Sequence, residues 1–219
     1  MLENPVLSAR EFMKIFAKGL VTGLTLQLAV GPVFFFIINL TLQRTVIDGL
    51  IGAAAVAFAD YIYIALGILG IGRLLEIKKF KKIFGIMSSV VLAGFGIFII
   101  KGTMENISLV TSTIGDTNLI SSFTSVFLLT ISNPLTIVLF TSIFAAKALE
   151  NDYTRKELFV FGSGTGLATF IFMGLSVILI SVFKAAIPIM LIQALNITVG
   201  CLLIVYAGYR FWKIFRYSF

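Results

Sequence analysis

Long apolar stretches separated by short clusters of charged residues are the feature that most restricts the fold of this chain. A helix needs about 20 mostly apolar residues to cross a bilayer, and 59% of the 219 residues are hydrophobic whereas 12% are charged. Six stretches are long enough to cross, at approximately residues 15–42, 47–75, 83–100, 119–147, 157–183 and 187–209. We therefore predict an all-α integral membrane protein with six transmembrane helices, forming a single transmembrane domain over residues 1–219.

The basic residues divide unequally between the two sides that six spans would define. Of the 17 lysines and arginines, all but Arg44, Lys101 and Lys184 fall on the side that holds both ends of the chain. By the positive-inside rule, this asymmetry predicts that both termini are cytoplasmic. The net charge of +7 is therefore explained by residues at the membrane surface, and we predict no nucleic-acid partner.

The sequence contains no histidine and one cysteine, Cys201. Neither a disulfide within the chain nor a histidine-based metal site or catalytic dyad can be built from these residues. A phosphate-binding loop of the Walker type is also absent, so uphill transport would need an ion gradient. We predict no enzymatic activity, no cofactor and no metal site.

Two prolines occupy matching places inside the first and fourth apolar stretches. Pro32 follows Gly31, and Pro134 follows Asn133. Proline removes a backbone donor and clashes with the carbonyl group four residues earlier, while glycine or asparagine before it eases departure from helical geometry. We therefore expect each of these two helices to break at this point.

Further matches between the two halves of the chain indicate an internal repeat. Residues 59–63 align with residues 168–172, and Gly94 of the third stretch can face Gly200 of the sixth. Together with the two prolines, they predict two three-helix repeats, at about 12–101 and about 119–212, each with a broken first helix. Because three is odd, the second repeat is expected to lie inverted in the membrane relative to the first.

Asp60 is the acidic residue that the sequence places inside the membrane, since the other nine, Asp48 among them, are assigned to tails and loops. It lies about 13 residues into its span, roughly 20 Å along a helix, near the middle of the bilayer. An aspartate there costs about 2.5–3.5 kcal/mol on insertion scales, so we expect it to face the interior of the bundle. Counting from the connecting loops puts Gly31, Asn133 and Thr169 at the same depth.

These positions predict a site for a small molecule that carries charges of both signs. A broken helix exposes carbonyl groups before the break and N–H groups after it, which are opposite partial charges. The carbonyls of Leu28–Gly31 are suited to an ammonium, and the N–H groups after Pro32 or Pro134 to a carboxylate. Asp60 would bind either a proton or the substrate ammonium, and this competition is the minimal requirement for antiport. The predicted substrate-binding residues are Gly31, Pro32, Asn133, Pro134 and Thr169.

The same residues resemble the lysine-exporter (LysE/RhtB) family of bacterial amino-acid exporters. The family's Gly-Pro, Gly-Leu, Gly-Asp and Asn-Pro pairs fall here on Gly31-Pro32, Gly49-Leu50, Ala59-Asp60 and Asn133-Pro134. The resemblance covers nearly the whole chain. It implies export of an amino acid or a similar small metabolite against inward proton flow, across the bacterial cytoplasmic (inner) membrane.

Other functions fit the sequence less well. A passive channel or membrane scaffold would make Asp60 and the repeat incidental, and a membrane-embedded enzyme would have to work with a single central acid. A metal exporter would lack a cluster of His, Cys or carboxylate ligands. The expected partners are the amino acid, protons and the lipid bilayer, and the sequence leaves open whether two copies form a homodimer.

Overall fold

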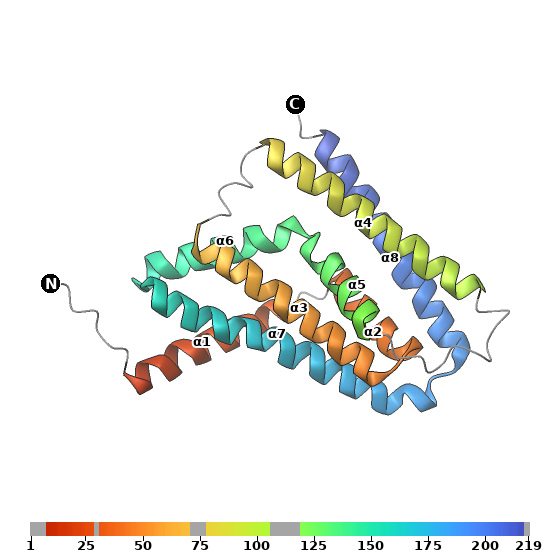
Figure 1. The fold of residues 1–219 in the computed structure, drawn as a ribbon, viewed down its shortest axis with the longest axis horizontal. Coiled ribbons are helices and arrows are strands. Elements are labelled where there is room, and N and C mark those ends of the chain that lie inside the picture. Colours follow the sequence, from red (N-terminus) through yellow and green to blue (C-terminus); the bar gives the residue numbers. More distant parts are fainter. Residues whose placement is uncertain (1–7, 29–30, 71–77, 106–118, 217–219) are drawn as a thin grey trace.

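The computed structural model describes residues 8–28, 31–70, 78–105 and 119–216. Throughout these ranges the regular secondary structure is helical (Figure 1). The helices are α1 (Ala9–Gln27), α2 (Pro32–Gln43), α3 (Val46–Ile68), α4 (Lys78–Glu105), α5 (Leu119–Ile131), α6 (Pro134–Glu150), α7 (Arg155–Phe183), the short 3-10 helix η2 (Lys184–Ala186) and α8 (Ile189–Arg216). The predicted all-α class is therefore confirmed.

Four of these helices are long and apolar enough to cross a membrane unaided. Their spanning segments are Val46–Ile68, Gly85–Met104, Arg155–Phe183 and Met190–Ile214. The remaining long helices form two bent pairs: α1 and α2 meet at 81°, and α5 and α6 at 64°. If each bent pair is one span, the described part of the chain contains six. The protein is a multi-pass membrane protein.

Both bends lie where proline was expected to interrupt a helix. Gly31, in extended geometry with a φ of −118°, precedes Pro32, which is the first residue of α2. Proline is tolerated at this position because the first N–H groups of a helix have no intrahelical partner. In the second half α5 ends at Ile131, and the carbonyl of Asn133 accepts the first backbone hydrogen bond of the next helix.

Several helices extend beyond their predicted bounds. Ser8 and Glu11 form a capping box, which satisfies free N–H groups and starts α1 at Ala9, well before residue 15. At the other end of the chain α8 continues to Arg216, past the predicted limit of residue 209. Charged residues at these ends belong to the helices, either as caps or as helical residues. The sequence prediction ended each helix at the edge of its apolar stretch and therefore made it too short.

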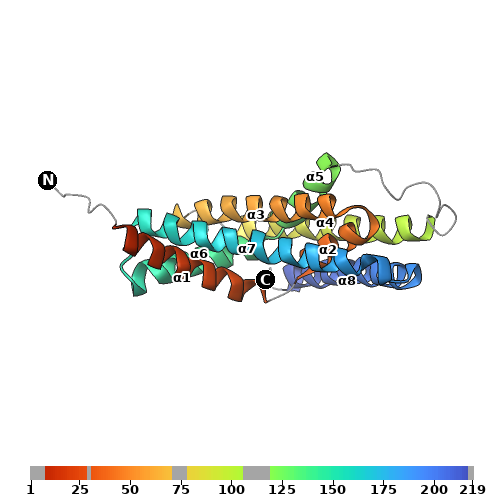
Figure 2. The same cartoon turned by 90° about the horizontal axis from the view of Figure 1, so that it is seen from below.

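The helices pack so that α7 lies between α1 and α3, as Figures 1 and 2 both show. The shorter helices of the two bent pairs add to this group: α5 and α6 both contact α3, and α2 contacts both α3 and α7. The helices α4 and α8 lie side by side along one edge of the molecule (Figure 1). The bend between α5 and α6 points toward this pair.

Glycine allows two of these helix pairs to approach backbone to backbone. A Cβ atom at Gly19 of α1 would overlap the carbonyl oxygen of Phe161 on α7. In the other pair Gly96 contacts the backbone of Gly200, whereas a Cβ on Gly94 would meet no atom within 4 Å. The residue opposite Gly200 is thus Gly96 and not Gly94. Such contacts between small residues are a principal source of helix association in membranes.

Buried apolar side chains form two clusters that follow α3. One surrounds its first half, including Ala53 and Val56, and the other its second half, including Ile64 and Ile68. Asp60 lies between them on the same helix. The fold therefore places a polar position between two apolar clusters.

Candidate substrate site

Three polar side chains from three helices form a continuous chain of hydrogen bonds beside the first bend. Asp60 of α3 is only 5% exposed, and its Oδ2 accepts a hydrogen bond of 2.7 Å from Oγ1 of Thr169 on α7. Thr169 Oγ1 in turn accepts one of 2.7 Å from Nε2 of Gln27, the last residue of α1. The described residues offer Asp60 no lysine or arginine within ion-pair distance. The carboxylate is thus held by one neutral hydroxyl.

The packing of α1 against α7 explains how Gln27 reaches Thr169. One and two turns earlier, Gly23 of α1 lies against Ala168, and Gly19 accepts a hydrogen bond of 3.1 Å from Thr165 Oγ1. These close contacts fix the register of the two helices. Gln27 follows one turn later on the same face.

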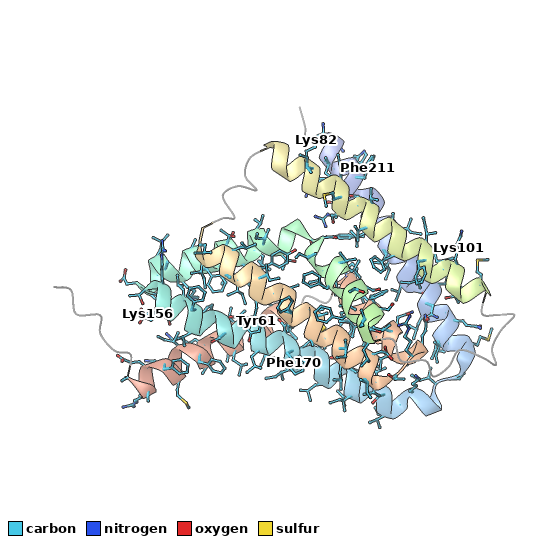
Figure 3. The ribbon with its side chains drawn as sticks, viewed as in Figure 1. Tyr61, Lys82, Lys101, Lys156, Phe170 and Phe211 are labelled. Atoms are coloured by element: carbon cyan, nitrogen blue, oxygen red, sulfur yellow. The ribbon has the colours of Figure 1, made fainter. Side chains whose placement is uncertain are left out.

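Aromatic residues follow both polar residues in the sequence. Tyr61 comes after Asp60 on α3, and Phe170 comes after Thr169 on α7 (Figure 3). The hydroxyl of Tyr61 donates a hydrogen bond of 3.1 Å to the carbonyl of Ser163 on α7. This contact ties α3 to α7 close to the Asp60–Thr169 pair.

Gly31 and Pro32 lie just beyond Gln27 but make no direct hydrogen bond to Asp60 in the described structure. A Cβ placed on Gly31 would meet no atom within 4 Å, so its backbone borders open space. The predicted ammonium-binding stretch Leu28–Gly31 includes residues 29–30, which lie outside the described residues. The structure therefore brings Asp60 and Thr169 into contact. Gly31 and Pro32, at the start of α2, follow Gln27 in the sequence and do not take part in this hydrogen bond.

The second bend has its own hydrogen-bond partners. The hydroxyl of Tyr63, one turn after Asp60 on α3, donates to the carbonyl of Ile131 at 2.7 Å and lies 3.4 Å from that of Asn133. The side-chain oxygen of Asn133 accepts a hydrogen bond of 3.1 Å from Nη1 of Arg210. Pro134 begins α6 directly afterwards. Backbone groups freed by the break are thus satisfied by side chains, as a break inside a membrane requires.

Arg210 is a site residue that the sequence analysis missed, because it was assigned to a cytoplasmic tail. It lies within the spanning segment Met190–Ile214 and is half-buried. Nη1 also donates to Ser88 Oγ of α4 at 2.7 Å, and the guanidinium lies 5.6 Å from the ring centre of Tyr206. Its position in a stretch with four aromatic residues, 206–212, was the signal that the helix continues.

Asp48 was assigned to a loop, but it is fully buried in the first turn of α3. Its two oxygens accept hydrogen bonds of 2.6 Å from Thr45 Oγ1 and from Ser122 Oγ of α5. Arg44 Nη1 donates to the same serine at 3.2 Å. The helix begins at Val46 with Thr45 as its N-cap, and α5 packs over this turn, which is why the carboxylate is covered.

Lys184, in the connection between α7 and α8, is a second cation at this end of the bundle. Its Nζ donates hydrogen bonds to the carbonyl oxygens of Thr41 and Arg44 at the end of α2. Burial lowers the pKa of the Lys184 ammonium, and the nearby Asp48 carboxylate opposes this effect. This end of the bundle is closed by a network of charged and polar groups.

A cavity of about 520 Å³ opens at the other end of the bundle, between α1, α6 and α7. Its lining includes Lys14, Lys18 and Lys147 together with Val21 and Phe161. The cavity does not include Asp60. Among the described residues no group of three or more His, Cys, Asp or Glu side chains could hold a metal ion.

A bundle of membrane-length helices with two bent pairs and a buried carboxylate beside one bend is typical of secondary transporters. Comparison with known proteins agrees: the family model described as LysE type translocator matches residues 24–211. The chain is also 29% identical over 203 residues to the protein named "Putative amino acid efflux protein YcgF" of Bacillus subtilis (strain 168), covering 90% of this chain and 95% of that protein. No solved structure matches. The chain belongs to the LysE type translocator family, so it is a transporter and not an enzyme.

Proposed function

We propose that the protein exports amino acids or closely related metabolites across the bacterial cytoplasmic membrane in exchange for protons. The observation that carries the proposal is the buried Asp60 carboxylate, bonded by Thr169 and adjacent to the end of α1. The family supports transport, and the relative named for amino acid efflux supports the substrate class. Asp60 is the site that a proton and the substrate ammonium occupy in turn.

The arrangement of helices supports an inverted repeat with six spans, and the excess of lysine and arginine on the side of both ends supports cytoplasmic termini. If α1–α4 correspond to α5–α8, the main contacts of α3 and α7 have counterparts: α1 with α7 corresponds to α5 with α3, and α2 with α7 to α6 with α3. The pairs α3 with α7 and α4 with α8 correspond to themselves. This is the pattern expected of two units related by a two-fold axis, and three spans in each unit would place this axis in the membrane plane.

Occupancy of Asp60 is transmitted to the first bend through Thr169. The hydroxyl of Thr169 donates its only proton to Asp60, and its oxygen accepts from Gln27. When Asp60 binds a proton or an ammonium, the carboxylate oxygen facing Thr169 becomes a weaker acceptor. The Gln27 amide at the end of α1 then changes its hydrogen bonding, which links the site to the angle between α1 and α2.

A flux measurement with purified protein tests the proposal. Proteoliposomes loaded with a panel of amino acids are assayed for efflux with and without an imposed proton gradient. Wild type is expected to show gradient-driven efflux, and Asp60→Asn is expected to lose the coupling while remaining folded. Glu150→Gln is the matched control, because it also removes one carboxylate but at an exposed surface position.

Two results would contradict the proposal. Unchanged proton coupling in Asp60→Asn would eliminate this residue as the proton site. Efflux that only follows the substrate gradient, whatever the pH on the two sides, would indicate a passive channel instead.

A further inference from the structure

Arg210 carries a permanent charge within a membrane-spanning segment, and the proposed function leaves this charge unused. The guanidinium is not deprotonated in proteins, and no carboxylate of the described residues lies within ion-pair distance of it. A charged side chain at such a position is costly, and it characteristically marks a substrate or ion pathway. The question is therefore which anion binds to this arginine.

Its hydrogen bonds leave one edge of the guanidinium uncommitted. Its two side-chain hydrogen bonds, to Ser88 Oγ and Asn133 Oδ1, both use Nη1. Within the described part of the chain, neither Nε nor Nη2 takes part in a side-chain hydrogen bond. Arginine presents its N–H groups as a planar fork that binds a carboxylate through two parallel hydrogen bonds. Nε and Nη2 form such a fork.

The position of Arg210 relative to Asp60 supports a role in substrate binding. Tyr63 follows Asp60 by one turn, and its hydroxyl lies at the second bend, where Asn133 binds Arg210. Tyr63 thus lies one turn from Asp60 on α3 and forms hydrogen bonds at the bend whose Asn133 accepts from Arg210. A carboxylate and a guanidinium near the same tyrosine are the pair of charges complementary to a zwitterion.

We infer that Arg210 binds the carboxylate of the exported molecule, so that the substrates are amino acids and not amines or amino-acid amides. The inference rests on the proposed function, in which Asp60 receives the ammonium. Because Arg210 also holds Asn133, the substrate carboxylate acts on the same guanidinium that tethers the second bend to α8. Substrate binding at Arg210 thus bears on the geometry of the α5–α6 pair.

Competition assays test this role directly. Proteoliposomes are loaded with a labelled amino acid and with an unlabelled competitor: the same acid, its amide or the decarboxylated amine. In wild type the free acid is expected to compete at least about tenfold better than the amide, since a charged hydrogen-bond partner is lost. Arg210→Gln is expected to raise the apparent KM for the acid and to abolish the preference over the amide, while Arg210→Lys keeps part of it.

Ser88→Ala is the matched control, because it removes a hydrogen bond of Nη1 but leaves the guanidinium charge. It should keep the acid-over-amide preference. All variants are compared at equal amounts of monodisperse protein. If Arg210→Gln does not fold, the acid-over-amide preference of Arg210→Lys is the test instead. A preference equal to that of wild type in the deciding variant overturns the inference. If the flux of the labelled acid also falls in that variant, the role of Arg210 is purely structural.

The result also separates this inference from the proposed function. If wild type exports no amino acid under any gradient, the proposed function fails and takes the substrate assignment with it. If wild type exports amino acids and the arginine variants retain full discrimination, the exporter stands and the role of Arg210 does not.

Discussion

The Gln27–Thr169–Asp60 chain makes a quantitative prediction about Thr169. Replacing it with valine keeps the shape of the side chain but leaves the Asp60 carboxylate without its donor and the Gln27 amide without its acceptor. A buried group left unsatisfied costs about 1–3 kcal/mol, and hydrogen bonds between transmembrane helices average about 0.6 kcal/mol. For two groups we expect Thr169→Val to lower the free energy of unfolding by about 1–6 kcal/mol.

The free energy of unfolding can be measured by titration with a denaturing detergent in mixed micelles. Thr169→Ser keeps the hydroxyl and loses one methyl group, so its expected loss is about 0.8 kcal/mol. A double-mutant cycle with Gln27→Leu separates the hydrogen bond from the packing. The reasoning is refuted if Thr169→Val is as stable as wild type, or if the two substitutions add to within about 0.3–0.5 kcal/mol.

Two further predictions concern packing and orientation. Gly19→Ala should destabilise the protein and lower its yield of folded material, because the added methyl overlaps the Phe161 carbonyl, whereas Gly94→Ala should be tolerated because its methyl meets no atom within 4 Å; comparing their thermal unfolding in detergent checks this, and equal stability would contradict it. A reporter active only outside the cytoplasm, fused after Phe219, should be inactive, and activity there would reverse the assigned orientation.

The parts of the fold that follow from local chemistry could be predicted from the sequence. The two bends are caused by proline after a residue that leaves helical geometry easily, and this depends only on neighbours in the chain. The contact between Asp60 and Thr169 was anticipated as a shared depth, since counting residues from the nearest loop fixes the height of a helical position. Both inferences need no knowledge of which helices touch.

The residues that were missed depend on contacts between distant segments. Arg210 meets Asn133 because α8 passes the second bend, and Ser122 covers Asp48 because α5 packs on α3. The sequence around a charged residue near the edge of an apolar stretch does not show whether its side chain faces the membrane surface or a neighbouring helix. Gln27 was overlooked for the same reason, since its partner Thr169 lies on a helix far along the chain.

The close contact of α1 with α7 has a mechanical consequence. Gly19 brings the two backbones together, so α1 and α7 should move as one rigid body. Beyond the first bend α2 contacts α3 and α8 as well as α7. The bend between α1 and α2 is then the hinge between two parts of the bundle with different sets of neighbours. Rotation about this hinge would carry Gln27 together with Thr169 and move Gly31 relative to both.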